Sequence, residues 1–220
     1  MVIAHHYAFT DRKEAGRRLA QALGHHAPSH PLVLALPRGG VPVAFEVARA
    51  LGADLDLLFV RKLGAPGHEE LGIGAVVDGA DPQIVLNEDI VRQLAPGADY
   101  IRDETRRQLA EIERRRHAYL GNRRPSPVEG RTVILVDDGI ATGGTVKAAL
   151  KGLRGAQASR IILAVPVAPV DSLAALRGDC DEIICLVQPE PFHAVGAHYA
   201  NFDQTSDAEV AALLAQAGQS

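Results

Sequence analysis

The chain has 220 residues, of which 47% are hydrophobic and 23% are charged, and this is ordinary for a globular protein with a sizeable core. Its formal net charge of −4 argues against non-specific attraction to nucleic acid, and no apolar run approaches the length needed to cross a bilayer. We therefore expect a single domain over residues 1–220, located in the cytoplasm, with its two cysteines, Cys180 and Cys185, reduced.

The first expected helix covers residues 10–26. Asp11 and Glu14 stand at the spacing of a capping box, and Leu19 and Leu23 belong to an apolar series with helical spacing. We expect this helix to pack across a sheet.

Two histidine pairs flank this helix, His5 with His6 and His25 with His26. No acidic or cysteine residue stands near either pair at the spacing of a metal-ligand set. We interpret the pairs as surface histidines, and we expect no metal site built from protein side chains.

The first strand is expected over residues 32–36, and a loop then leads into a helix over residues 43–51. In that loop Gly39 and Gly40 let backbone N–H groups come close to an anion, and Arg38 adds positive charge. The loop suits a diphosphate group. Taken alone, however, Arg-Gly-Gly is more often a plain turn.

The second strand is expected over residues 55–60, which are mostly apolar. It would deliver Arg61 and Lys62 at its end, the edge where open α/β sheets bind their ligands. Cations at that edge would face the anion-binding loops. A solvated basic pair is the alternative.

Residues 64–72 are rich in glycine and charge, and we expect them to form a loop that is mobile without ligand. His68 and Glu69 in this loop are candidate functional residues. The segments 73–77 and 83–86 follow as a hairpin or two short strands.

A long, highly charged helix is expected over residues 99–120. Near its end lie the arginines that form the best nucleic-acid candidate of the chain: Arg114, Arg115, Arg116, Arg123 and Arg124. Acidic residues are interleaved with them, which favours a solvated amphipathic face, so nucleic acid is not expected as a partner.

Residues 133–145 carry the strongest functional signal. A buried strand ends at two acids, Asp137 and Asp138, and a glycine-containing loop then opens a helix. The loop offers closely spaced N–H groups, two hydroxyls and the positive end of a helix dipole, which together suit a phosphate group. Carboxylates accept hydrogen bonds from hydroxyls, so the ligand should carry vicinal OH groups near a phosphate, as ribose 5-phosphate does.

Further strands are expected over residues 160–167 and 182–187, on either side of a short helix. Repeated alternation of strands and helices predicts an α/β fold with an open, mostly parallel twisted sheet and helices on both faces. The segment 191–203 is rich in aromatic residues, and Ser206 with Glu209 should cap a final helix. The aromatic side chains would either stack on a flat ring or anchor this segment to the core.

Position by position, residues 133–145 resemble the phosphoribosyl diphosphate (PRPP) signature of the type I phosphoribosyltransferases. The resemblance implies that Asp137 and Asp138 meet the ribose hydroxyls. It implies that the 5′-phosphate is wrapped by Ala141, Thr142, Gly143, Gly144 and Thr145.

The same resemblance assigns roles elsewhere in the chain. The loop with Arg38, Gly39 and Gly40 would bind the pyrophosphate part of PRPP, often through a strained or cis peptide bond, and Lys62 with Arg61 would help to neutralise the leaving pyrophosphate. Residues 64–72 would close over PRPP and exclude water. A small hood over the base would be drawn from residues 64–97 and 189–220.

The implied reaction is transfer of the 5-phosphoribosyl group from PRPP to an acceptor nitrogen, expected to be that of a nucleobase, with Mg²⁺ held mainly through PRPP. Some purine-specific relatives carry a carboxylate where this chain has Ala141, so the acceptor proton must go elsewhere. One alternative is a PRPP-sensing regulator that binds RNA, DNA or protein. Another is hydrolysis or pyrophosphoryl chemistry at the same site. A homodimer is left open.

Overall fold

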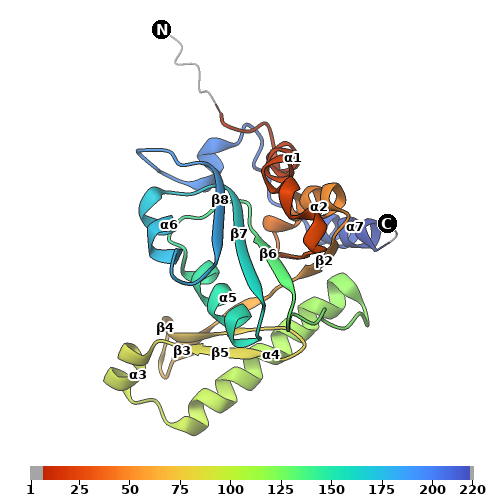
Figure 1. Cartoon of the computed structure of the whole chain (residues 1–220). Helices are drawn as coiled ribbons and strands as arrows, with labels where there is room; N and C mark the ends of the chain where they lie inside the picture. The colour runs from red at the N-terminus through yellow and green to blue at the C-terminus, as the bar shows by residue number, and fades with distance from the viewer. Residues whose placement is uncertain (1–6, 219–220) are drawn as a thin grey trace.

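A computed structural model describes residues 7–218, apart from the side chains of Glu69 and Glu70. The histidines His5 and His6 therefore lie outside the described residues. Five strands form a parallel sheet in the order β2-β1-β6-β7-β8 (Figure 1). Their bounds are β1 Leu32–Ala35, β2 Asp54–Leu57, β6 Thr132–Val136, β7 Arg160–Val167 and β8 Glu182–Val187. The expected parallel α/β sheet is confirmed.

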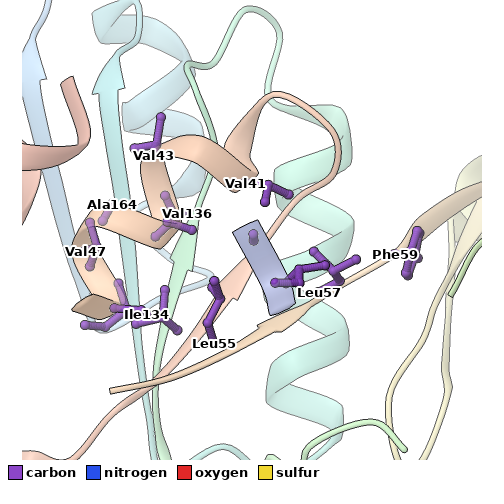
Figure 2. Close-up of a cluster of buried hydrophobic side chains, with 14 of the residues drawn as sticks. Val41, Val43, Val47, Leu55, Leu57, Phe59, Ile134, Val136 and Ala164 are labelled. Carbon is purple, nitrogen blue, oxygen red and sulfur yellow. The ribbon is translucent and has the colours of Figure 1, made fainter. Parts of the chain in front are cut away.

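Helices cover both faces of this sheet because the side chains of successive strand residues alternate between the two faces. One face packs against α1 (Arg12–Leu23), α2 (Gly40–Leu51) and α7 (Asp207–Ala217). The other packs against α5 (Gly144–Gly155) and α6 (Val170–Leu176). In Figure 2, apolar side chains of α2 lie together with apolar side chains of β6 and β7.

A second, antiparallel sheet joins β3 (Val60–Ala65), β4 (His68–Val77) and β5 (Gln83–Leu86). The short helix α3 (Glu88–Leu94) and the long helix α4 (Ala98–Leu120) follow it. We call these five elements the hairpin module. It lies below the main sheet in Figure 1.

The hairpin module corrects two sequence predictions. The apolar run 55–60 is not one strand, because the chain leaves the main sheet after β2 and enters the second sheet at Val60. Residues 64–72 are not a loop, since most of them belong to β3 and β4. Gly74, two residues further along β4, allows close approach to β5, because a Cβ on it would overlap the Val85 carbonyl oxygen.

A buried ion-pair network fixes the hairpin module to the main sheet. Arg116 of α4 donates two hydrogen bonds of 2.7 and 2.8 Å to Asp56 of β2 and a third, of 3.1 Å, to Asp78 after β4. Asp78 also accepts a hydrogen bond from the Phe59 N–H, at the point where the chain changes sheets. Including Arg116 in a basic surface cluster was therefore wrong.

Three other arginines of the cluster near the end of α4 also have partners. Arg114 and Arg115 both bind Glu111 at 2.8 Å, and Arg123 donates to the Leu55 carbonyl oxygen at 2.7 Å. The solvated amphipathic face is confirmed for Arg114 and Arg115, whose ion pairs lie on the surface of the helix.

Asp78 yields a pH-dependent prediction. Burial raises the pKa of its carboxyl group from 3.8 to about 6, even though Arg116 opposes the shift. Between these two values the folded state keeps a proton that the unfolded state has lost, so the stabilisation falls as the pH rises from about 4 to about 6. Relative to an Asp78→Asn variant, the unfolding free energy of the wild type should fall by about 3 kcal/mol over this window.

Urea unfolding of both proteins at pH 4, 5, 6 and 7 measures this difference. A difference that is constant, or that grows with pH, would mean that the ion pair with Arg116 outweighs the cost of burial.

Within residues 7–218 no helix combines the length and apolar character required to span a membrane. Cys180 and Cys185 are free thiols, as expected, and burial raises the pKa of each to about 11.

Candidate active site

The candidate site is formed where β1 and β6 end side by side. Ala35 is paired with Val136 in the sheet, so the loops that follow these two strands emerge next to each other. The Leu36 N–H donates to the Val136 carbonyl oxygen at 3.0 Å, which extends the pairing into the first loop. The diphosphate loop and the acid pair expected from the sequence are therefore neighbours in space.

Two glycines allow these loops to touch. A Cβ on Gly39 would overlap Asp138 Oδ2, and a Cβ on Gly40 would lie 2.8 Å from the Val136 carbonyl oxygen. The peptide bond between Pro37 and Arg38 in the same loop is cis, one of the two forms that the family resemblance implied. No residue with a side chain fits at Gly39 without moving the acid pair.

The acids follow directly after β6, which ends at Val136. Strand alternation no longer constrains them there, so both carboxylates can serve one ligand. Asp138 Oδ2 accepts a 2.8 Å hydrogen bond from Arg12 Nε, and Asp137 Oδ1 accepts one of 2.8 Å from the Asp138 N–H. Both acids are thus fixed in place directly after the end of β6.

Burial dominates the electrostatics of the acid pair. It raises the pKa of Asp137 well above its ordinary value, and the neighbouring charge of Asp138 raises it further. Burial also raises the pKa of Asp138, although Arg12 opposes that shift. Hydrogen-bond donors or a cation would stabilise the ionised carboxylates, so the pair is suited to a ligand that brings hydroxyls or a metal ion.

The phosphate loop has the geometry expected from the sequence. Gly143 adopts a left-handed conformation with φ of 78° and leads into α5, whose N-terminus has no side-chain cap in the described part of the chain. The first N–H groups of this helix are therefore available to an anion. Ser172 of α6 donates to the Ala141 carbonyl oxygen at 2.6 Å and holds the start of the loop.

Arg38 lies in the first loop, as expected, and its side chain turns toward the N-terminus of α7. Its Nη1 is 3.3 Å from Asp207 Oδ1, and Tyr119 also donates to that oxygen, at 2.7 Å. The pair is partly exposed, with 38% of the Arg38 side chain accessible, so it contributes little stability and is readily exchanged for an anionic ligand.

Arg61 and Lys62 do not end a strand of the main sheet, and this expectation was wrong. Both lie within β3 of the hairpin module. Arg61 Nε donates to Gln108 of α4 at 2.9 Å, and the Lys62 side chain lies over Gly72 of β4. The hairpin module nevertheless reaches the first loop at one point, because Tyr119 of α4 donates to Asp207, the partner of Arg38.

Sequence reasoning missed Arg12 and the role of Tyr199. Besides binding Asp138, Arg12 lies 3.8 Å above the Phe202 ring, and its Nη1 donates to the Asp203 carbonyl oxygen at 2.7 Å. The Tyr199 hydroxyl donates to the Asp138 carbonyl oxygen at 2.6 Å. Arg12 of helix α1 and Tyr199 of the C-terminal segment therefore hold Asp138 in place.

The C-terminal segment is mainly an anchor. Tyr199 is buried, and its ring lies 5.3 Å from Phe9 and 5.0 Å from Phe202, measured between centroids. Helix α7 buries Val210, Leu213 and Leu214 against the main core, while a hood drawn from residues 64–97 and 189–220 stays a prediction. Phe192 is partly buried and stacks on His198.

The residues present fit a magnesium ion bridged to the protein by water or by a ligand. Mg²⁺ prefers oxygen ligands, and the acid pair offers carboxylate oxygens beside a loop suited to phosphate. The glycines that bring Asp138 and Asp137 against the first loop place those oxygens where a bound diphosphate would lie.

A family model described as phosphoribosyl transferase domain matches residues 8–200, so the chain belongs to this family. A curated protein of Mycobacterium tuberculosis H37Rv, named provisionally as a phosphoribosyl transferase, is 49% identical over 209 residues. That alignment covers 95% of this chain and 47% of the relative, so the chain spans about half the length of this curated relative.

Two further relatives are informative. The crystal structure of TT1426 from Thermus thermophilus has a TM-score of 0.82 and 41% identity, covering 94% of this chain and 98% of that one. The ribose-phosphate pyrophosphokinase of Methanopyrus kandleri is 33% identical over 183 residues, which cover 71% of this chain and 61% of the relative. The TT1426 structure has the same fold over nearly the whole chain.

Proposed function

We propose that this chain transfers the 5-phosphoribosyl group from PRPP to an acceptor nitrogen, which is that of a nucleobase, and releases pyrophosphate. The observation that carries the proposal is the contact between the two loops. An acid pair suited to a ribose diol lies beside an uncapped helix N-terminus suited to a phosphate and touches an Arg-Gly-Gly loop suited to a diphosphate. PRPP carries these three groups in one molecule.

The residues of the chain act mainly by binding and positioning. Asp137 and Asp138 accept hydrogen bonds from the ribose hydroxyls, and the N–H groups of residues 142–145 hold the 5′-phosphate. Arg38 leaves Asp207 and binds the diphosphate together with the N–H group of Gly39, whereas the Gly40 N–H stays donated to the Leu36 carbonyl oxygen at 3.1 Å. When bound, Mg²⁺ supplies positive charge that stabilises the departing pyrophosphate.

The acceptor must lose its proton without help from the phosphate loop. Ala141 is exposed and has no titratable group. An acceptor that is already anionic at neutral pH, or that releases its proton to water, therefore fits best. This weakens a hypoxanthine or guanine assignment and leaves adenine-like, pyrimidine-like and non-nucleobase acceptors open.

A panel of bases tests the proposal. Purified protein, PRPP and Mg²⁺ are incubated with each base, and released pyrophosphate and the new nucleotide are measured together. We expect equimolar pyrophosphate and nucleotide with at least one acceptor. If PRPP binds but no acceptor is ever ribosylated, transfer fails and the PRPP-sensing alternative stands.

A second candidate is pyrophosphoryl transfer from ATP to ribose 5-phosphate, the reaction named for the Methanopyrus kandleri relative. That likeness favours it, and the same ribose-phosphate site would serve. AMP and PRPP would form from ATP and ribose 5-phosphate, whereas base transfer consumes PRPP. The regulatory alternative was motivated by the arginine cluster, and it loses support because Arg116 is buried and bound to Asp56.

Arg12 gives a prediction for this site. Arg12→Gln removes a charge-assisted hydrogen bond that holds Asp138 in place, so the affinity for PRPP should fall about tenfold while the protein stays folded. Arg17→Gln is the matched control, since Arg17 is an exposed residue of the same helix. Titration calorimetry with PRPP measures both variants, and equal affinities would show that Arg12 does not position the acid.

A further inference from the structure

The described residues include a cluster of metal-ligand side chains at the other edge of the main sheet. The 3₁₀ helix η1 (Gly24–Ser29) follows α1 and carries His25 and His26, and Glu182 is the first residue of β8. One ligand atom from each of the three side chains lies within 4.8 Å of the others. Glu182 is 156 positions from His26, so sequence spacing could not reveal it.

The geometry of the cluster is close to that of a coordination site. His26 Nε2 lies 3.3 Å from Glu182 Oε1, and His25 Nε2 lies 3.7 Å from the same oxygen. In a tetrahedral zinc site with bonds of about 2.0–2.1 Å, neighbouring ligand atoms lie roughly 3.4 Å apart. Small shifts would therefore place all three atoms around one ion.

The local fold of η1 holds the imidazole rings of His25 and His26 next to each other. Their ring centroids are only 3.9 Å apart, an arrangement that the tight turn of η1 permits for successive residues. His26 is buried, with 5% of its surface exposed, whereas the His25 side chain is 61% exposed. The site is therefore anchored on its inner side and open to water on its outer side.

Arg160 orients the carboxylate. It donates a 2.7 Å hydrogen bond to Glu182 Oε2, which also lies 3.2 Å from His26 Nε2, while Oε1 lies within 3.7 Å of both histidines. A hydrogen bond to the second oxygen of a ligating carboxylate is a common supporting contact in metal sites. The positive charge of the Arg160 guanidinium also offsets part of the negative charge of Glu182. A site of this reduced charge suits two neutral imidazoles and a single carboxylate.

We propose that His25, His26 and Glu182 bind a transition-metal ion of the zinc class, with water completing the coordination. Two imidazole nitrogens and one carboxylate oxygen form a ligand set typical of Zn²⁺ and unlike that of Mg²⁺. The ion would join η1 to β8, the outer strand of the main sheet, which is hydrogen-bonded only to β7 in the sheet of described strands (Figure 1). It would thereby stabilise the sheet edge.

This site is separate from the acid pair. Arg12 contacts Asp138 at the start of α1, and η1 begins after the last residue of that 12-residue helix, about 18 Å away along its axis. The proposal therefore does not depend on the proposed transferase function.

Zinc titration of the untagged chain tests the proposal, with calorimetry for stoichiometry and thermal unfolding for stability. His5 and His6 are replaced by alanine in every protein, because the described residues do not include them. We expect one Zn²⁺ per chain at this site and a higher melting temperature with Zn²⁺. His25→Ala and Glu182→Gln should each weaken binding about tenfold or more and abolish the melting shift.

Two controls make the result specific. His117→Ala removes an exposed histidine of α4 and should leave Zn²⁺ binding unchanged. Asp137→Asn should also leave it unchanged, which separates this site from the acid pair. The proposal is overturned if the wild type binds no Zn²⁺ at millimolar concentration, or if the exposed-residue variant His25→Ala binds it as tightly as the wild type does.

Discussion

Replacing Asp137 and Asp138 together by asparagine will weaken PRPP binding by two to four orders of magnitude. Each carboxylate is expected to accept a charge-assisted hydrogen bond from a ribose hydroxyl, and such bonds contribute about 1.5–3 kcal/mol. Loss of two corresponds to about 3–6 kcal/mol, and each 1.4 kcal/mol changes the affinity about tenfold. Titration calorimetry with PRPP and Mg²⁺ measures the change directly.

The fold should tolerate this double substitution. Burial raises the pKa of both acids, so their ionised forms are costly to the folded state, and the isosteric amides remove that cost. We expect an unchanged or higher melting temperature. Asp99→Asn, at a carboxylate that is 84% exposed on α4, is the matched control. Wild-type PRPP affinity in the double variant would place the ribose elsewhere.

Gly39→Ala will disable the site through a single methyl group. The new Cβ would overlap Asp138 Oδ2 and lie 2.7 Å from its Cγ, which is closer than carbon atoms approach without bonding. Asp138 cannot simply rotate away, because Arg12 Nε binds the same oxygen at 2.8 Å and Tyr199 holds its backbone carbonyl. Either the acid pair or the diphosphate loop must move.

Because both loops bind the same proposed ligand, kcat/KM for pyrophosphate release should fall by about 100-fold or more, as expected for a misplacement of about 1 Å. Overpacking of this kind also costs about 1–3 kcal/mol of unfolding free energy, which urea titration measures. Gly178→Ala is the matched control, since its Cβ would meet nothing within 4 Å. Wild-type kinetics in Gly39→Ala would show that the two loops need not touch.

The main sheet could be predicted because its strands are continuous apolar runs joined by turn and cap signals. The segments 133–136, 160–167 and 182–187 appear in the structure as β6, β7 and β8 with nearly the expected bounds. The cap signals were also reliable. The Glu14 N–H donates to Asp11 at 2.7 Å, and the Glu209 N–H donates to Ser206 at 3.1 Å.

The strands over 73–77 and 83–86 and the long helix of the hairpin module were predicted, but the point where the chain enters the module could not be predicted from local sequence. Leu58 and Phe59 continue an apolar run, and no glycine or proline marks the point where the chain changes sheets. Asp78 and Arg116 hold that point from positions far along the chain, so the turn is a tertiary effect. As a result, Arg61 and Lys62 were expected at the end of a main-sheet strand, whereas they lie within β3.

Only part of the candidate site could be predicted from the sequence. The acid pair, the loop expected to bind phosphate and the Arg-Gly-Gly loop each lie within a short segment. The residue types of each segment indicate which ligand group it suits. Arg12 and Tyr199 lie 126 and 61 positions from Asp138, and neither stands in a pattern that points to it. Glu182 was hidden from the histidine pair for the same reason.

A crystal structure of the protein with PRPP and Mg²⁺ tests the central claim most directly. It should show the 5′-phosphate within hydrogen-bond distance of the N–H groups of residues 142–145, the ribose hydroxyls on Asp137 and Asp138, and the diphosphate against Gly39 and Gly40. A complex in which PRPP binds away from these loops, with the crevice beside Thr142 empty, would contradict the account.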